Sequence, residues 1–317
     1  MKRVLWKIST LFAIFALPLS VAHAADPGKT NYVSIIGGSS GGSWYLVAAG
    51  QANVIKKHVP GVDATAQPGG GAENIIRVAK KEVVFGMTMS DNAFFADKGA
   101  REYRKKYPEI RAIMGGHDNP MKLIVRTDSG INSVADLKGK KVGMGYPGSA
   151  QAITTADLME SMGLRPDQDF KAQWLTPKEV AEALQDGTID AGFIYIADPT
   201  GLIIELASRT PIKFIPLDLG KALAGKPYWY KTKVPGGTYK GIDEDYVTQG
   251  ANVILITHKD TDPELVYQVT KALFEHVDEV GETHPAGKEW NLQNATRGVT
   301  IPFHPGAERY LKEKGVR

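Results

Sequence analysis

Glycine- and serine-rich loops contain the residue types in this sequence that are best suited to binding or catalysis. The first loop reads GGSSGGSWY, and Gly37 to Gly41 fit the G-x-S-x-G pattern that places a serine nucleophile on a strand-to-helix turn. In hydrolases of that kind several strands precede the turn, whereas here only the strand predicted at residues 32–36 precedes it. Ser43 also stands where a phosphate-binding G-x-x-x-x-G-K loop requires lysine, and G-x-G-x-x-G spacing is absent. The pattern therefore favours a loop that binds a small anion over a nucleophile or a nucleotide site.

The same kind of junction recurs along the chain. Five predicted strands end in small-residue loops that open a predicted helix, at residues 37–43, 67–74, 89–93, 146–151 and 197–201. In open α/β sheets, ligands bind beyond the carboxyl ends of the strands, where the first N–H groups of helices are unpaired. Three loops lie in the first part of the chain and two in the middle part. We therefore expect two domains that face each other across an anion-binding cleft.

Serine hydroxyls in these loops are candidate ligand contacts, because a hydroxyl both donates and accepts a hydrogen bond. We expect the middle domain to bind a carboxylate through Ser149 and the amides of Gly148 to Ala150. The alternative for each serine is a role as helix N-cap, which Ser and Asp also favour. The first domain is expected to complete the site with Ser40, Ser43, Ser90 and Asp91.

Aromatic and acidic residues near the loops have two interpretations each. Trp44 and Tyr45 begin a predicted helix and could wall the cleft, or one of them could pack in the core. Asp91 or Asp198 could pair with an ammonium group of the ligand, although Asp198 before proline also suits a turn. The six histidines after residue 24 are scattered without H-E-x-x-H spacing, and the sequence has no cysteine. We expect no metal, no cofactor and no enzymatic activity.

The first 24 residues have the layout of a secretory signal peptide. Three basic residues precede the apolar run LFAIFALPL, and Ala22-His23-Ala24 is a small-x-small cleavage site. We expect cleavage near Ala24/Ala25 and a periplasmic product without a membrane anchor, since no later run approaches the ~20 apolar residues that span a bilayer. Removing these three basic residues leaves 38 − 3 = 35 basic residues against 35 acidic ones. A chain without net charge is not expected to bind nucleic acid, and we expect a monomer.

Short apolar runs alternate with helical patterns, which predicts an α/β fold built from parallel strands. Two apolar strands, at residues 121–126 and 251–258, bracket a middle block that has strands and helices of its own. We expect them to form a strand hinge between two α/β domains, with the ligand cleft in between. The Gly- and Pro-rich stretch at residues 226–241 is predicted to be a surface loop. The predicted domains are domain 1 at residues 25–122 and 251–317, and an inserted domain 2 at residues 123–250.

Longer stretches of the sequence carry a family resemblance. The longest is VRTDSGINSVADLKGKKVGMGYPGSA at residues 125–150, and QPGGGAEN, FGMTMSDNA, GTIDAGFIYIADPT, VPGGTYKGIDEDYVT and IPFHPGAERYLKEKG accompany it in order. Together with GGSSGGSWY they resemble the TAXI family, the extracytoplasmic solute-binding proteins of TRAP transporters. The resemblance implies a type II periplasmic-binding-protein fold that closes on a small carboxylate such as glutamate, glutamine or 2-oxoglutarate. It also implies delivery of that ligand to a fused, ion-gradient-driven permease.

The resemblance also implies that the ligand is bound by residues 40–45, by Gln67, by Ser90 with Asp91, and by residues 147–150. Trp44 and Tyr146 depart from the common family pattern with larger side chains, which could shrink or reshape the pocket. Two alternatives stay open: a binding protein of similar fold that serves an ABC importer or a sensor, and a secreted serine hydrolase with Ser39 or Ser40 as nucleophile. The expected ligand-binding residues are Ser40, Gly41, Gly42, Ser43, Trp44, Tyr45, Gln67, Ser90, Asp91, Pro147, Gly148, Ser149, Ala150 and Asp198.

Overall fold

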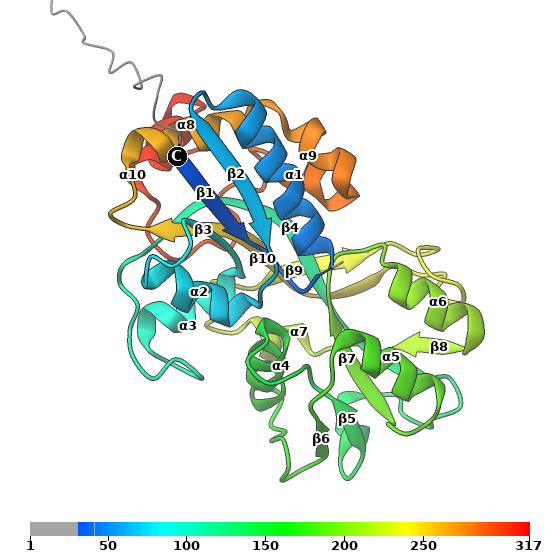
Figure 1. Ribbon diagram of the computed structural model, residues 1–317. Helices are drawn as coiled ribbons and strands as arrows, with labels where there is room; N and C mark the ends of the chain where they lie inside the picture. Colours follow the sequence, from blue (N-terminus) through cyan, green and yellow to red (C-terminus); the bar gives the residue numbers. More distant parts are fainter. Residues whose placement is uncertain (1–30, 41) are drawn as a thin grey trace, which may run out of the picture.

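A mixed β-sheet runs through two lobes, and helices surround it in both (Figure 1). The computed structural model describes residues 31–40 and 42–317. Its strands are β1 (Asn31–Ile36), β2 (Val62–Gln67), β3 (Phe85–Met89), β4 (Ile110–Arg126), β5 (Lys141–Gly143), β6 (Lys171–Gln173), β7 (Ala191–Tyr195), β8 (Ile212–Phe214), β9 (Tyr230–Val234) and β10 (Tyr246–His258). Its α-helices are α1 (Ser43–His58), α2 (Gly71–Ala79), α3 (Ser90–Lys98), α4 (Ala150–Ser161), α5 (Pro177–Gln185), α6 (Gly201–Arg209), α7 (Leu219–Leu223), α8 (Pro263–Glu275), α9 (Val277–Thr283) and α10 (Pro305–Glu313). Two short 3-10 helices are η1 (Val134–Leu137) and η2 (Pro285–Glu289).

The strand order is β2-β1-β3-β10-β4-β7-β5-β6, with β8 paired to β4 and β9 paired to β10. β1 pairs in parallel with β2 and β3, as expected for strands that are connected through helices. β10 runs antiparallel to both of its main neighbours, β3 and β4. The late strand β10 therefore inserts between strands of the early chain and returns the chain to the first lobe.

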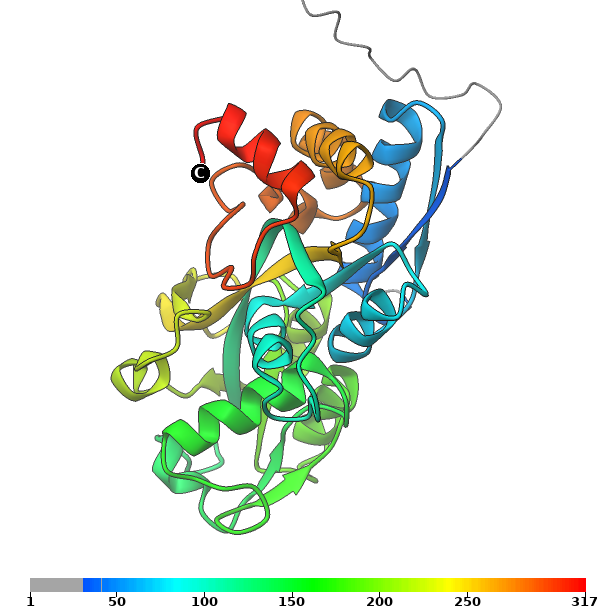
Figure 2. The same cartoon turned by 90° about the vertical axis from the view of Figure 1, so that its left-hand side faces the viewer.

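Two long strands connect the lobes. β4 has 17 residues and β10 has 13, and both are buried along nearly their whole length. The first part of β4 pairs with β10, and its last part pairs with β7 and β8 of the second lobe. Figure 2 shows β4, in teal, running from one lobe into the other. Buried on both faces, these strands need apolar residues at successive positions, as in Leu123-Ile124-Val125 and Val253-Ile254-Leu255-Ile256.

Local sequence decides where several helices begin and end. α3 ends before Gly99, whose φ of 66° lies in the left-handed region that glycine adopts without strain. The helix therefore stops at Lys98. Thr176 caps α5 and forms a capping box with Glu179, and Pro177 occupies the first helical position.

The structure confirms the predicted α/β fold of two lobes joined by strands. The expected boundaries at 122/123 and 250/251 fall inside β4 and β10, so the exact division into domains stays a prediction. The loop predicted over residues 226–241 is wrong in part, because β9 forms there and pairs with β10. In β9, Lys231 and Lys233 are exposed, whereas the side chains between and after them are partly buried or, at Val234, buried. The expected signal peptide lies outside the described residues, and no helix within them is long and apolar enough to cross a membrane.

Candidate functional site

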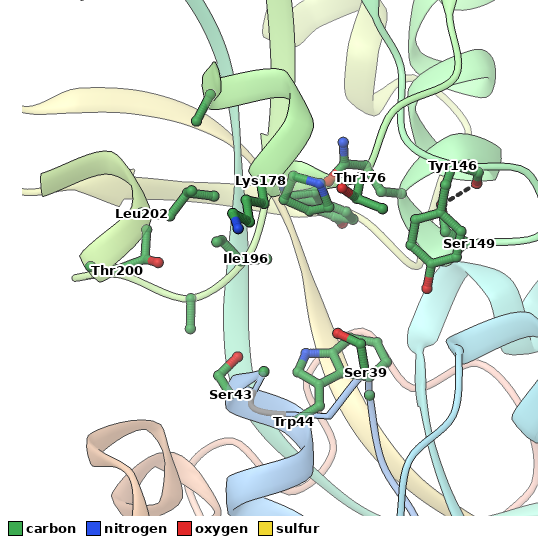
Figure 3. A pocket seen from close by; sticks show the side chains of 18 of the residues that line it. Ser39, Ser43, Trp44, Tyr146, Ser149, Thr176, Lys178, Ile196, Thr200 and Leu202 are labelled. Atoms are coloured by element: carbon green, nitrogen blue, oxygen red, sulfur yellow. Dashed lines mark hydrogen bonds between the residues drawn. The ribbon is translucent and has the colours of Figure 1, made fainter. Parts of the chain in front are cut away.

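A cavity of about 1170 Å³ lies between the two lobes. Its walls come from loops that follow strands and from the helices that these loops open. Figure 3 shows Ser43 and Trp44 of the first lobe facing side chains of the second lobe, among them Thr200. The cleft between the lobes is therefore lined by both halves of the molecule.

Helix N-termini supply backbone N–H groups to this cavity. The first N–H groups of an α-helix have no partner inside the helix, and the aligned peptide dipoles leave partial positive charge at this end. The first turns of α1, α2 and α6 have no side-chain cap, so water or a ligand has to satisfy their amides. The first residues that line the cavity are Ser43 of α1, Gly71 of α2, Ala150 of α4, Pro177 of α5 and Gly201 of α6.

Charged side chains lie at the rim of the cavity in exposed pairs. Lys178 Nζ lies 3.6 Å from Glu182, and Arg209 lies 3.0 Å from Glu205. Water screens such exposed pairs strongly, and they leave no excess of positive charge at the rim. Among the described lining residues, no lysine or arginine is buried. Partial positive charge inside the cavity therefore comes from the helix amides.

Trp44 lies between the cavity and the core. Its ring is partly buried, packs against the main apolar core and also lines the cavity. A methyl group added to Gly71 would lie 3.3 Å from the Trp44 ring and 3.0 Å from Ala150 Cβ of the second lobe. Trp44 thus serves as both wall and core, and Gly71 sits where the two lobes approach closely.

A second cavity of about 560 Å³ adjoins the first. The two cavities share Ser39, Gly69, Gly70 and Tyr146, so Tyr146 stands at the passage between them. Burial, with a further contribution from the charge of Glu73, raises the pKa of Tyr146. Its hydroxyl therefore remains neutral at ordinary pH and can donate a hydrogen bond at this passage.

A buried ion pair supports one wall of the main cavity. The Lys122 side chain is fully buried, and its Nζ donates to Asp198 Oδ2 at 2.8 Å and to the carbonyl of Ile196 at 2.6 Å. The Tyr239 hydroxyl donates to the other oxygen of Asp198. Burial lowers the pKa of Lys122, and the charge of Asp198 opposes that effect. Asp198, expected to meet a ligand ammonium, thus meets Lys122 and holds the wall that includes Ile196.

Two other expected ligand contacts also bond within the protein. The Ser90 hydroxyl is buried and donates to the carbonyl of Tyr228 at 3.1 Å. Asp91 Oδ2 accepts hydrogen bonds from Thr154 Oγ1 at 2.6 Å and from Trp229 Nε1 at 2.9 Å. These bonds run from α3 of the first lobe to the second lobe, so Ser90 and Asp91 tie the lobes together. Neither residue lines either cavity.

The remaining expected residues fall into four groups. Tyr45 and Gln67 line neither cavity, and Gln67 accepts a hydrogen bond from Arg77 at 3.3 Å. Pro147 and Gly148 line the second cavity. Gly41 lies outside the described residues. The expected residues that the structure brings together around the main cavity are Ser40, Gly42, Ser43, Trp44, Ser149 and Ala150.

Ser149 shows how a serine can line the cavity and still be a cap. Its hydroxyl donates to the carbonyl of Tyr146 at 2.7 Å and accepts from the amide of Ala152 at 3.1 Å. These bonds fix the start of α4 and leave the amides of Ala150 and Gln151 without a side-chain cap. Ser149 therefore positions the helix N-terminus, in addition to facing the cavity.

Among the residues that the structure describes, no general base lies beside the serines of the serine-hydrolase alternative. Ser39 and Ser40 are exposed, and no described histidine is hydrogen-bonded to either. A serine nucleophile needs a base within hydrogen-bond reach. The GGSSG pattern is thus better explained by the close turn from β1 into α1.

Sequence reasoning missed the cavity wall formed by Thr176, Lys178 and Leu202. The junction that carries Thr176 lacks glycine and serine, so the small-residue criterion did not select it. The capping-box pattern T-P-x-E after β6 was the available signal, since it marks another helix start beyond a strand.

Comparison with solved structures identifies the fold. The periplasmic aliphatic sulphonate binding protein SsuA from Escherichia coli matches with a TM-score of 0.53 and 16% identity, covering 90% of this chain and 84% of that one. A TctC solute binding protein from Polaromonas matches at 0.53 and 17% identity, covering 92% and 99%. A Xanthomonas citri protein solved with bound ATP matches at 0.55 and 13% identity, covering 90% and 97%. These likenesses confirm the periplasmic-binding-protein-like fold. The model of the NMT1-like family matches residues 35–315, and the chain therefore belongs to the NMT1-like family.

Proposed function

We propose that this protein captures a small organic anion in the cavity between its lobes and delivers it to a membrane transporter. The observation that carries the proposal is the convergence of five helix N-termini, from both lobes, on one cavity that has no buried lysine or arginine among its described lining residues. Such an arrangement suits a negatively charged group, because helix amides donate hydrogen bonds and carry partial positive charge. The fold it shares with a sulphonate-binding protein and a solute-binding protein supports the same role.

Binding proceeds by closure of the lobes around the ligand. The amides at the start of α1 and α2 belong to the first lobe, and those at the start of α4 and α6 belong to the second. A ligand that contacts both sets binds the closed arrangement more tightly than an open one, and it shifts the population accordingly. β4 and β10 run through both lobes and are the strands about which such a motion turns.

We further propose that the ligand is a small carboxylate and that the transporter is of the TRAP class with a TAXI-type binding protein. The support is the ordered set of sequence stretches that resemble that family, from GGSSGGSWY to IPFHPGAERYLKEKG. In this proposal the protein is a periplasmic monomer, and its partner is a fused permease driven by an ion gradient. Uptake of the ligand into vesicles that carry a fused permease encoded beside this protein tests the transporter class. We expect an ion gradient to drive uptake without ATP, and a requirement for ATP overturns this assignment.

A thermal-shift screen tests the proposed function directly. A specific ligand raises the melting temperature by mass action, so the purified protein is screened against glutamate, glutamine, 2-oxoglutarate and alkanesulfonates. For each active carboxylic acid the fully esterified methyl ester is the matched control, because it keeps the carbon skeleton and removes the negative charge. Stabilisation by an acid and none by its ester is expected. Equal stabilisation by both, or binding of cationic compounds only, contradicts anion capture.

A further inference from the structure

Two histidines and a glutamate meet on the first lobe, where α1 ends beside the joint between α8 and α9. His58 Nε2 lies 2.9 Å from Glu279 Oε1, and His276 Nδ1 lies 3.3 Å from the same oxygen. One nitrogen or oxygen from each residue lies within 4.8 Å of the others. None of the three residues lines either cavity. The cluster is therefore separate from the anion site.

We propose that His58, His276 and Glu279 form a binding site for a divalent zinc ion. Zinc accepts imidazole nitrogen and carboxylate oxygen at about 2.0–2.2 Å, and in a tetrahedron with such bonds two ligand atoms lie about 3.3 Å apart. The contacts of 2.9 and 3.3 Å around Glu279 Oε1 are close to that spacing. Two imidazoles select zinc over calcium and magnesium, which prefer oxygen ligands. Three protein ligands leave the fourth position for water.

The surroundings of the cluster orient its carboxylate. Lys57 Nζ lies 2.9 Å from Glu279 Oε2, so this oxygen is held while Oε1 faces the two histidines. Such an outer hydrogen bond fixes a metal-binding carboxylate in place. His58 belongs to the last turn of α1, where the carbonyl end of the helix favours a cation. This attraction offsets the repulsion between the zinc ion and the ammonium group of Lys57.

Zinc binding requires a local movement of the two rings. The imidazoles of His58 and His276 are stacked, with centroids 3.5 Å apart and planes 7° from parallel. A ring nitrogen binds metal through a lone pair in the ring plane, so the rings turn out of the stack when the metal enters. The last side-chain torsion of histidine is soft, and the side chains are 21% and 34% exposed, which leaves room for the turn.

Competition with a chromogenic zinc chelator tests the proposal on the untagged, metal-stripped protein. One zinc ion per chain is expected, together with a rise in melting temperature, because the ion joins segments 221 positions apart. His58→Gln, His276→Gln and Glu279→Gln each remove a ligand. Loss of a residue that only supports a metal ligand lowers metal affinity about 10–100-fold. Each of these substitutions removes a ligand itself and is therefore expected to weaken zinc binding by at least that factor.

Glu282→Gln is the matched control, since it makes the same change on α9 at an exposed position outside the cluster. This variant is expected to bind zinc as the unchanged protein does. Circular dichroism and the melting temperature without metal show that each variant is folded, and Glu279→Gln preserves the size of the side chain. The proposal is overturned if the unchanged protein binds no zinc, or if the folded ligand variants bind zinc as tightly as Glu282→Gln.

Discussion

Asp91 of α3 accepts a hydrogen bond of 2.6 Å from Thr154 of α4, and both side chains are completely buried. Because α3 belongs to the first lobe and α4 to the second, this bond crosses between the lobes. Trp229 donates to the same carboxylate oxygen. Burial raises the pKa of Asp91, and the hydrogen bonds from Thr154, Asn92 and Trp229 oppose that effect. Opening of the lobes therefore leaves α4 attached to α3 or breaks a buried polar network.

Replacing Asp91 is expected to destabilise the fold. Asp91→Ala leaves the donors of Thr154 and Trp229 without an acceptor, and each unpaired buried donor costs about 1–3 kcal/mol. Urea denaturation measures the free energy of unfolding. Asp97→Asn on the same helix is the control, because Asp97 is partly exposed and pairs only with its neighbour Lys98; a change within about 0.5 kcal/mol is expected there. Equal effects of the two substitutions would show that the interlobe bonds contribute nothing.

A methyl group at Gly71 is expected to weaken ligand binding. Gly71→Ala places a carbon 3.0 Å from Ala150 Cβ and 3.3 Å from the Trp44 ring, so it obstructs the approach of the lobes over the cavity. Gly201→Ala is the matched control, because it also changes the first residue of a cavity-facing helix but meets nothing within 4 Å. Calorimetry with the ligand found by thermal shift should show weaker binding for Gly71→Ala alone. Unchanged affinity in both variants would place the ligand elsewhere.

Removal of the Lys122 ammonium is expected to be strongly destabilising. Lys122→Met leaves the Asp198 carboxylate buried without its counter-ion, and breaking a buried pair in this way costs about 3–5 kcal/mol. The double variant Lys122→Met with Asp198→Asn should recover part of the loss, because no unpaired charge remains. Guanidinium denaturation of the single and double variants measures both effects. A single variant as stable as the unchanged protein would mean that this ion pair does not support the cavity wall.

His117 is expected to make the fold sensitive to acid. Its Nδ1 accepts a hydrogen bond from Trp290 at 3.0 Å, and burial, with a smaller effect of His284, lowers the pKa of His117 to about 3. The ordinary histidine value is 6.5. Between these values the unfolded chain binds a proton that the folded chain excludes, so stability falls as the pH falls, by up to about 1.4 kcal/mol per pH unit.

The variant His117→Asn tests this linkage, since an asparagine oxygen can still accept from Trp290 but does not titrate. The free energy of unfolding is measured from pH 7 to pH 4 in both proteins. A smaller slope is expected for the variant. The same slope in both would assign the acid sensitivity to other groups.

Much of the fold could be predicted because its signals are local. Apolar runs such as that of residues 251–258 are short and bounded by turn residues, and helices follow them at regular intervals. β9 was missed because its two lysines and the Gly- and Pro-rich residues around it favoured a loop, although every second side chain of the strand is partly or fully buried. Two helices carry weak local signals, because α7 has only five residues and α10 follows a long irregular stretch.

The candidate site was predicted only where a residue's role follows from its own loop. Ser43, Trp44 and Ser149 open helices beyond strands, and all three line the cavity. Asp91 and Asp198 have the same local context but face partners from distant segments, Thr154 and Lys122. No local pattern shows whether a polar side chain at a helix start faces a ligand or the other lobe.

The sequence by itself determined the alternation of strands and helices, and with it the edge of the sheet where helix amides collect. Periodicity and turn residues act over a few positions, so the order of residues is enough to reveal them. Only the tertiary structure decided which residues of the two lobes face each other across the cavity. It also decided that Lys122 pairs with Asp198, and that His58 lies 2.9 Å from Glu279 although 221 positions separate them. Such contacts depend on how buried surfaces pack together, and packing is a property of the whole chain.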